Sequence, residues 1–322
     1  MYVLSFLDKR WTAILFLLVG AVVLLVGFQS DKASNIATKQ QLGERLFFDP
    51  LLSGDKTISC ASCHKPQFGF ADTATFSEGV RKQLGKRNTP SVTNLSGRPM
   101  LFWDGRAGSL EEQALVPIAN PEEMDLPIED AVGRLKASTL YRNAFLRIFK
   151  EEPSKSNLSG ALAAYQRTLE TANSPYDRYI NGDDHAISTE AKRGRMLFIG
   201  KANCNTCHSG EDFTADRFKS IGLYNGKDLH DVGRYAITGD SSQLGLFKVP
   251  GLRNVAITAP YMHNGMFKTL KDVVEYYNDP DAVIKDGKNR DLALDEPLQL
   301  SVQEVDDLVA FLETLTDDRF KK

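Results

Sequence analysis

The stretches CASCH at residues 60–64 and CNTCH at residues 204–208 decide the fold of this 322-residue chain. Two thiols one helical turn apart can both add to the vinyl groups of one haem, and the adjoining histidine can then ligate the iron. The two motifs use all four cysteines of the chain, so none remains for a structural disulfide. We therefore expect two covalently bound haem c groups. The expected attachment and ligand residues are Cys60, Cys63 and His64 for the first haem and Cys204, Cys207 and His208 for the second.

Two other interpretations of a Cys-x-x-Cys pair are a zinc site and a thioredoxin-like redox pair. A zinc site needs its ligands pooled in one place, whereas these two pairs are far apart in the sequence. Redox chemistry of the thioredoxin kind does not need the adjoining His64 or His208. Two complete motifs that use every cysteine favour haem attachment.

An internal repeat surrounds the motifs. GERLF at residues 43–47 precedes the first motif and GRMLF at residues 194–198 precedes the second, and each motif is followed by an aromatic residue and an aspartate. Such self-similarity predicts two related domains. We expect a mainly α fold of two fused class I cytochrome c-like haem domains with long loops, at residues 31–185 and 186–322. The Asn-, Ser- and Gly-rich residues 173–188 form the expected linker.

The helical pattern is clearest at the end of the chain. Ser301 and Glu304 form a predicted capping box, and apolar residues then recur on one helical face. Residues 160–171 predict a second good helix. No segment alternates cleanly enough to predict a large sheet. Haem domains of this kind need few strands, because the porphyrin itself fills the core.

The first thirty residues differ from the rest. Twenty residues between Arg10 and Asp31 carry no charge, and a helix of that length spans roughly 30 Å, enough to cross a bilayer. Lys9 and Arg10 precede this run, which places the N-terminus in the cytoplasm. We expect residues 1–30 to be an uncleaved inner-membrane anchor, with a cleaved signal peptide as the alternative. Either way the haem domains are exported to the periplasm, where haem attachment occurs.

Composition indicates a folded protein and lends no support to one function class. Hydrophobic residues make up 42% of the chain and charged residues 25%, which is typical of a folded globular protein. The net charge of -3 gives no support to nucleic-acid binding, which normally shows a basic face.

Further motifs indicate a family. They are RNTPS at 87–91, FWDGR at 102–106, NPEEM at 120–124, FKVP at 247–250 and APYMHNG at 259–265. With these segments the chain resembles the bacterial di-haem cytochrome c peroxidase and MauG family over nearly its whole length after residue 40. The resemblance implies that hydrogen peroxide is split at the His64 haem while the His208 haem relays electrons.

The same resemblance implies roles for individual residues. Gln113 and Glu123 match the amide and the acid beside the peroxide, and the acid would move a proton between the two peroxide oxygens. Trp103 matches a tryptophan between the haems that assists electron transfer. Pro117 matches a proline that lines the open pocket in MauG. The residues that match an interdomain calcium site are Asn88, Thr258 and Pro260, the last two through backbone carbonyls.

The sequence departs from the usual peroxidases at both haems. The loop 65–86 has no histidine, where the usual enzymes carry a removable ligand. The first haem should therefore be open and need no reductive activation, although Met100, Met124 and several lysines remain possible ligands. On the second haem, Tyr277 replaces the usual methionine, as in MauG-like proteins. Met262 and Met266 are rival ligands there, and at least one tyrosine of the pair Tyr276–Tyr277 should pack within its helix.

Three functions follow from these expectations. The first is reduction of hydrogen peroxide with electrons from a small periplasmic donor, a cytochrome c or a cupredoxin. The second is MauG-like, peroxide-dependent oxidation of Trp or Tyr side chains in a partner protein, and the third is electron transfer without catalysis. The missing histidine, with Gln113 and Glu123 present, argues against the third function, whereas Tyr277 favours the second. A homodimer is expected from the resemblance alone.

Overall fold

A computed structural model describes residues 36–321. The expected anchor or signal segment, residues 1–30, lies outside the described residues. Within residues 36–321, no helix combines the length and apolar character needed to cross a bilayer.

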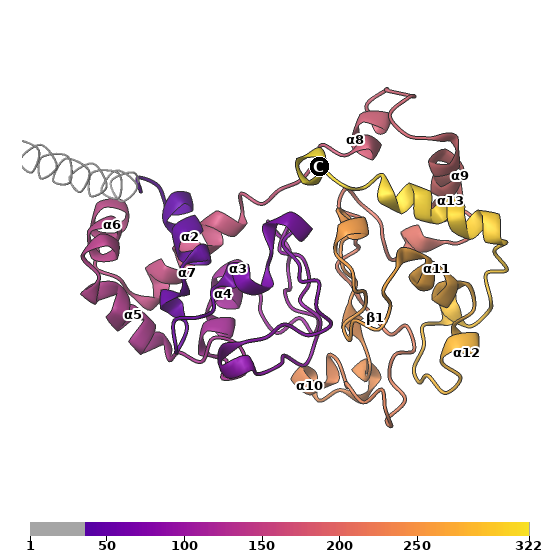
Figure 1. Cartoon of the computed structure of the whole chain (residues 1–322). Coiled ribbons are helices and arrows are strands. Elements are labelled where there is room, and N and C mark those ends of the chain that lie inside the picture. Colours follow the sequence, from indigo (N-terminus) through magenta and orange to yellow (C-terminus); the bar gives the residue numbers. More distant parts are fainter. Residues whose placement is uncertain (1–35, 322) are drawn as a thin grey trace, which may run out of the picture.

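The described chain is mainly helical, with long loops, as predicted (Figure 1). The first half contains α2 (Lys39–Phe48), α3 (Cys60–Cys63), α4 (Leu110–Ala119), α5 (Ile128–Ala137), α6 (Thr139–Phe149) and α7 (Lys155–Gln166). The second half contains α8 (Pro175–Ile180), α9 (Thr189–Ile199), α10 (Tyr235–Thr238), α11 (Leu270–Asn278), α12 (Pro280–Val283) and α13 (Val302–Glu313). Short 3-10 turns lie at Pro50–Leu52, Pro66–Phe68, Val80–Lys82, Cys204–Thr206, Ser241–Gln243, Val255–Ile257, Leu292–Leu294 and Asp318–Phe320. Strands β1 (Phe218–Lys219) and β2 (Phe247–Lys248) form a two-residue antiparallel ladder, so the described residues contain no large sheet.

Two helix boundaries test the sequence analysis. The capping box of Ser301 and Glu304 is present at the start of α13, as predicted. The second predicted helix, residues 160–171, was misplaced: α7 begins at Lys155 because Ser154 caps it, and it ends at Gln166. The expected linker, residues 173–188, also contains the short helix α8.

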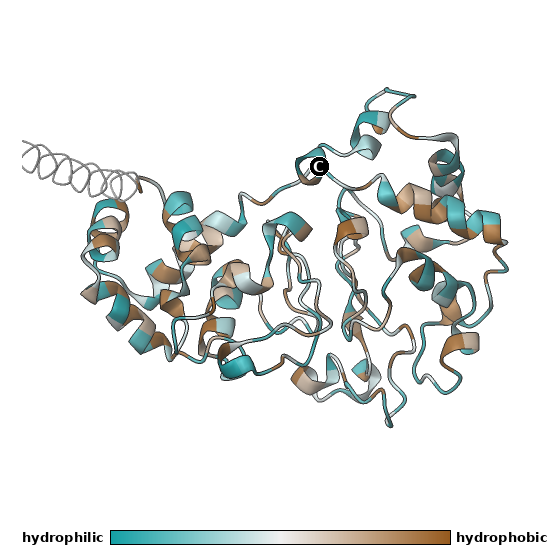
Figure 2. Ribbon diagram, viewed as in Figure 1, coloured by the Kyte–Doolittle hydropathy of each residue, from teal (hydrophilic) through white to brown (hydrophobic). Residues whose placement is uncertain are grey.

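Each half has its own apolar core. One cluster runs from Ile36 to Leu169 and the other from Phe198 to Leu315, with apolar residues along the inner side of helices such as α13 (Figure 2). The end of the described chain crosses back to the first half, where Phe320 packs against Phe70. The chain passes from the first core to the second between Leu169 and Tyr176, and the boundary at residue 185 stays a prediction.

The repeat in the sequence corresponds to two close helix crossings. At Gly43, where α2 crosses α7, a Cβ atom would lie 1.9 Å from the carbonyl oxygen of Ala161. At Gly194, where α9 crosses α13, a Cβ atom would lie 1.9 Å from the carbonyl oxygen of Asp307. Only glycine allows two helix backbones to approach this closely. The repeated glycines therefore hold equivalent helix pairs together in the two halves.

We predict that Gly194→Ala destabilises the protein by about 3 kcal/mol, because the added methyl group would force α9 and α13 apart. The measurement is the unfolding midpoint of the purified holoprotein in denaturant, followed by circular dichroism.

Gly133→Ala in α5 is the matched control, because no atom lies within 4 Å of a Cβ at that position. This variant should be unchanged or more stable by about 1 kcal/mol, since alanine favours a helix over glycine. Equal stability of the two variants would contradict the role assigned to Gly194.

Candidate functional site

One cavity of about 1220 Å³ lies between the two halves. It is larger than the roughly 300–1,000 Å³ of an ordinary small-molecule pocket. Its walls include all six residues of the two motifs that were expected to hold haem: Cys60, Cys63, His64, Cys204, Cys207 and His208. The donor set and the size of the cavity fit two haem groups.

The four thiols do not fit the alternative interpretations. Burial raises the pKa of the Cys60 and Cys204 thiols to about 12, which disfavours the thiolate that thioredoxin-like chemistry needs. In the described part of the chain, no group of three or more His, Cys, Asp or Glu side chains could hold a metal ion.

The two motif histidines are oriented in the same way. Nδ1 of His64 lies 3.0 Å from the carbonyl oxygen of Phe70, and Nδ1 of His208 lies 3.0 Å from that of Phe213. A donating Nδ1–H leaves the Nε2 lone pair free to bind a metal. Phe70 and Phe213, both with positive φ, appear in the sequence only as part of the repeat. Their carbonyl groups are one functional feature that the sequence did not reveal.

Gln113 and Pro117 lie one turn apart on α4, and both line the cavity. Residues four apart share one face of a helix, so the two side chains present a common wall. Pro117 has no N–H, and the carbonyl of Gln113 therefore lacks its usual helical donor. Ser109 caps the helix by accepting from the amide of Glu112.

Glu123 follows α4 in a loop that is held by backbone contacts. Its carbonyl accepts from the amide of Val80, and its carboxylate accepts from Nδ2 of Asn120 at 2.8 Å. Burial raises the pKa of Glu123, and the Asn120 hydrogen bond and the charge of Arg106 lower it. The neighbouring Glu122 pairs with Lys86 at 2.6 Å. The two acids therefore have different environments.

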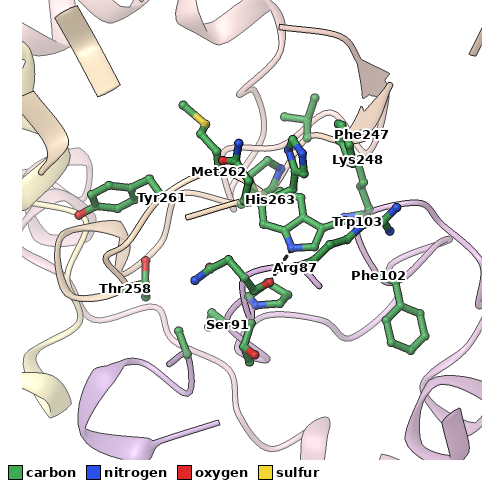
Figure 3. A pocket seen from close by; sticks show the side chains of 18 of the residues that line it. Arg87, Ser91, Phe102, Trp103, Phe247, Lys248, Thr258, Tyr261, Met262 and His263 are labelled. Atoms are coloured by element: carbon green, nitrogen blue, oxygen red, sulfur yellow. Dashed lines mark hydrogen bonds between the residues drawn. The ribbon is translucent and has the colours of Figure 1, made fainter. Parts of the chain in front are cut away.

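A cluster of three aromatic side chains, Trp103, Phe247 and His263, joins the two halves at the cavity (Figure 3). Trp103 donates from Nε1 to the carbonyl of Asn88 at 2.8 Å, and its ring meets His263 edge-on at 6.5 Å. His263 stacks on Phe247, with the ring centroids 3.7 Å apart and the planes at 13°. Burial lowers the pKa of His263 to about 4, so the ring is neutral. In the sequence His263 stands only as part of the APYMHNG segment, and nothing there indicates this contact.

Arg87 forms an ionic clamp between the halves. It donates from Nε and Nη2 to Asp231 at 2.7 and 2.8 Å, and from Nη1 to Asp104 at 2.6 Å. Its guanidinium also lies over the ring of Phe247. A forked contact of this kind fixes both distance and orientation. The clamp holds the Trp103 loop against the wall that carries His263.

The two tyrosines of α11 have different surroundings. Tyr276 is fully buried and donates from its hydroxyl to the carbonyl of Ile221. Tyr277 lines the cavity, and burial raises the pKa of its hydroxyl, with further contributions from Tyr276 and the thiols Cys204 and Cys207. Tyr276 is thus the tyrosine that packs within the fold.

The methionine alternatives separate in a similar way. Among the described residues, Met262 and Met124 line the cavity, whereas Met100 and Met266 do not. The sulfur of Met266 accepts a hydrogen bond from Asn264, and Met124 belongs to the core of the first half.

Comparison with known proteins decides the family. The di-haem cytochrome c peroxidase model matches residues 37–185, and the cytochrome c model matches residues 191–316. A methylamine utilization protein MauG of Methylorubrum extorquens is 43% identical over 86% of this chain and 78% of its own length. The chain belongs to the di-haem cytochrome c peroxidase family. A cytochrome c551 peroxidase of Nitrosomonas europaea is 36% identical over 88% of this chain and 81% of its own length.

Solved structures of the family have the same fold. A MauG-like protein associated with microbial copper homeostasis superposes with a TM-score of 0.81 at 33% identity, over 88% of this chain and 90% of its own. The diheme peroxidase BthA of Burkholderia thailandensis gives 0.78 at 29% identity, over 88% of this chain and 86% of its own. The chain is therefore an oxidoreductase of the di-haem peroxidase family with two haem c groups.

The residues that match the family's calcium site also line the cavity: Asn88, Thr258 and Pro260. Nδ2 of Asn88 lies 3.2 Å from the carbonyl of Ala74 and 3.3 Å from that of Thr75. With the amide nitrogen on these carbonyls, the side-chain oxygen remains free for a cation. The calcium ion that the resemblance implies at this position stays a prediction.

We predict that Tyr277→Phe changes the optical and spin-resonance spectra of the oxidised second haem, because a phenolate ligand would be lost. Tyr276→Phe is the matched control and should leave both spectra unchanged, since its hydroxyl bonds to backbone. Unchanged spectra in Tyr277→Phe would exclude Tyr277 as a ligand and leave Met262 as the candidate.

Proposed function

We propose that this protein reduces hydrogen peroxide to water in the His64 half of the cavity, without prior reductive activation. The electrons come from a small periplasmic donor, a cytochrome c or a cupredoxin. The observation that carries the proposal is that Gln113, Pro117 and Glu123 all line the cavity, with the amide of Met124, next to Glu123, bonded to the carbonyl of Pro117. The loop 65–86, which carries a removable ligand in the usual peroxidases, contains no histidine.

The chemistry divides between cofactor and protein. When bound, the haems supply the two electrons that, with two protons, convert one hydrogen peroxide into two waters. The amide of Gln113 can orient the peroxide by hydrogen bonding. Glu123 accepts the proton of one peroxide oxygen and delivers it to the other oxygen, which leaves as water. This transfer needs the ionised carboxylate, which the Asn120 hydrogen bond favours.

Electrons must reach this half from the His208 half. Trp103 supports such a transfer because its ring contacts His263 of the other half while its indole N–H is held by Asn88. The Arg87 clamp keeps this contact at a fixed geometry.

A second candidate function is MauG-like oxidation of Trp or Tyr side chains in a partner protein. Tyr277 on the cavity wall favours it, as does the 43% identity to a MauG protein. An anionic phenolate ligand would lower the potential of the second haem and disfavour electron uptake from an ordinary cytochrome. The third candidate, electron transfer without catalysis, has the least support. It would not need the polar side chains Gln113 and Glu123 on the cavity lining.

The site of action follows from the sequence. Haem is attached covalently outside the cytoplasm, and residues 1–30 carry the apolar run of a membrane anchor or signal peptide. We propose a periplasmic protein, anchored to the inner membrane or released by cleavage.

The proposal predicts that hydrogen peroxide changes the optical spectrum of the fully oxidised protein without any reductant. An open first haem makes this reaction immediate. Stopped-flow absorbance is the measurement. A spectrum that stays constant in excess peroxide would rule out every peroxide-driven function.

Steady-state turnover then separates the two candidate functions. A peroxide reductase should oxidise reduced cytochrome c continuously when peroxide is added. A protein that changes its spectrum with peroxide but turns over poorly with cytochrome c would support the MauG-like function instead.

The environment of Glu123 predicts a pH dependence. The peroxide reaction should slow as the pH falls through the raised pKa of Glu123, because protonation removes the proton acceptor. Asn120→Ala removes a hydrogen bond to the Glu123 carboxylate, so the pKa of Glu123 rises further. The acid limb of the pH–rate profile should then shift to higher pH by about one unit.

Glu122→Gln is the opposing control. The charge of Glu122 raises the pKa of Glu123, and its removal should move the acid limb to lower pH. If both variants moved the limb in the same direction, Glu123 would not be the group that titrates.

A further inference from the structure

Residues 101–107 form a tight loop that carries more than Trp103. The amide of Leu101 donates to the carbonyl of Ala107 at 2.8 Å, which closes the loop. Gly105 has φ of +73°, and a Cβ there would lie 2.4 Å from Nη1 of Arg234. A side chain at position 105 would therefore collide with Arg234.

The loop presents different side chains on two sides. Trp103 points toward His263, whereas Phe102 points away from this aromatic cluster (Figure 3). The guanidinium of Arg106 lies 3.7 Å from the centroid of the Phe102 ring. Arg106 is thus held on the side of the loop away from the Trp103 contact.

Arg106 shares its carboxylate partner. Its Nη1 donates to Oδ2 of Asp104 at 2.8 Å, and the same oxygen accepts from Arg87 at 2.6 Å. Arg87 is also paired with Asp231, so the two guanidinium groups and the two carboxylates balance in charge. Phe102 covers the face of Arg106, and an arginine carries five N–H donors in its plane, so further donors remain at its edge. The side chain is 32% exposed and lines the cavity.

The charge of Arg106 also affects Glu123, one of the residues proposed to bind peroxide. Arg106, Gln113 and Glu123 all line the same cavity. Burial raises the pKa of Glu123, and the positive charge of Arg106 opposes this effect. Its charge is therefore felt on the side of the loop where peroxide is proposed to bind.

We propose that Arg106 is the anion-binding residue of the peroxide pocket, where its guanidinium donates hydrogen bonds to a small anion or hydroperoxide beside Gln113. The inference rests on the proposed function, since it assumes that peroxide enters this half of the cavity. Stacking on Phe102 and pairing with Asp104 hold the guanidinium in place, so little conformational freedom is lost on binding.

Fluoride is a suitable probe because it is a small anion that accepts hydrogen bonds. The oxidised holoprotein is titrated with fluoride at one pH, and the visible spectrum gives the dissociation constant. Arg106→Leu should weaken fluoride binding about tenfold or more, as expected for a lost hydrogen bond from a charged donor. Arg106→Lys should lie between Arg106→Leu and the wild type. Binding of neutral imidazole should be unchanged.

Arg234→Leu is the matched control. Arg234 stacks on Phe218 at 3.9 Å and donates to the backbone carbonyl of Asp104, but it does not line the cavity. Its removal should leave fluoride affinity unchanged. An unchanged spectrum of the second haem in every variant shows that the fold is intact.

Three results would overturn the inference. The first is equal fluoride affinity in Arg106→Leu and the wild type. The second is a parallel loss of fluoride and imidazole binding, which would indicate a change of pocket shape. The third is a loss of fluoride affinity accompanied by a shifted potential of the first haem, which would assign Arg106 to a haem carboxylate. Failure of the peroxide reaction alone, with the fluoride result as expected, would overturn the proposed function and leave the anion site standing.

Discussion

The two halves of this protein depend on one constraint, a helix crossing in which a glycine lets two backbones touch. Gly43 sets this distance between α2 and α7, and Gly194 sets it between α9 and α13. The crossed helices then position the functional ones, because α4 packs on α7 and α11 packs on α13. The wall with Gln113 and the wall with Tyr277 are therefore built on equivalent frames.

The sequence predicted the parts of the structure that local chemistry determines. The two motifs, the repeated glycines and the capping box at Ser301 are all readable in short windows. The start of α7 was missed because Ser154 pairs with Asn157 in its cap, whereas the usual box has Glu or Gln. Its end was missed because Asn94 binds both backbone groups of Thr171 and draws the chain out of the helix.

Features that depend on distant residues could not be predicted. Arg87 and Asp231 are 144 positions apart, and nothing in either segment indicates the other. The stack of His263 on Phe247 likewise depends on how two loops meet. Gln113, Glu123 and Tyr277 were found only through family resemblance. Their different surroundings explain how one fold repeated twice can offer two unlike sites, a polar wall in one half and a tyrosine in the other.

The position of the Arg87 clamp links the contact between the halves to the contents of the cavity. All four cysteines face a cavity whose walls come from both halves, and the clamp closes these walls against each other. The Arg87 clamp therefore joins two walls across a space that must also accommodate both porphyrins, so the fit of the two halves depends on what fills the cavity between them.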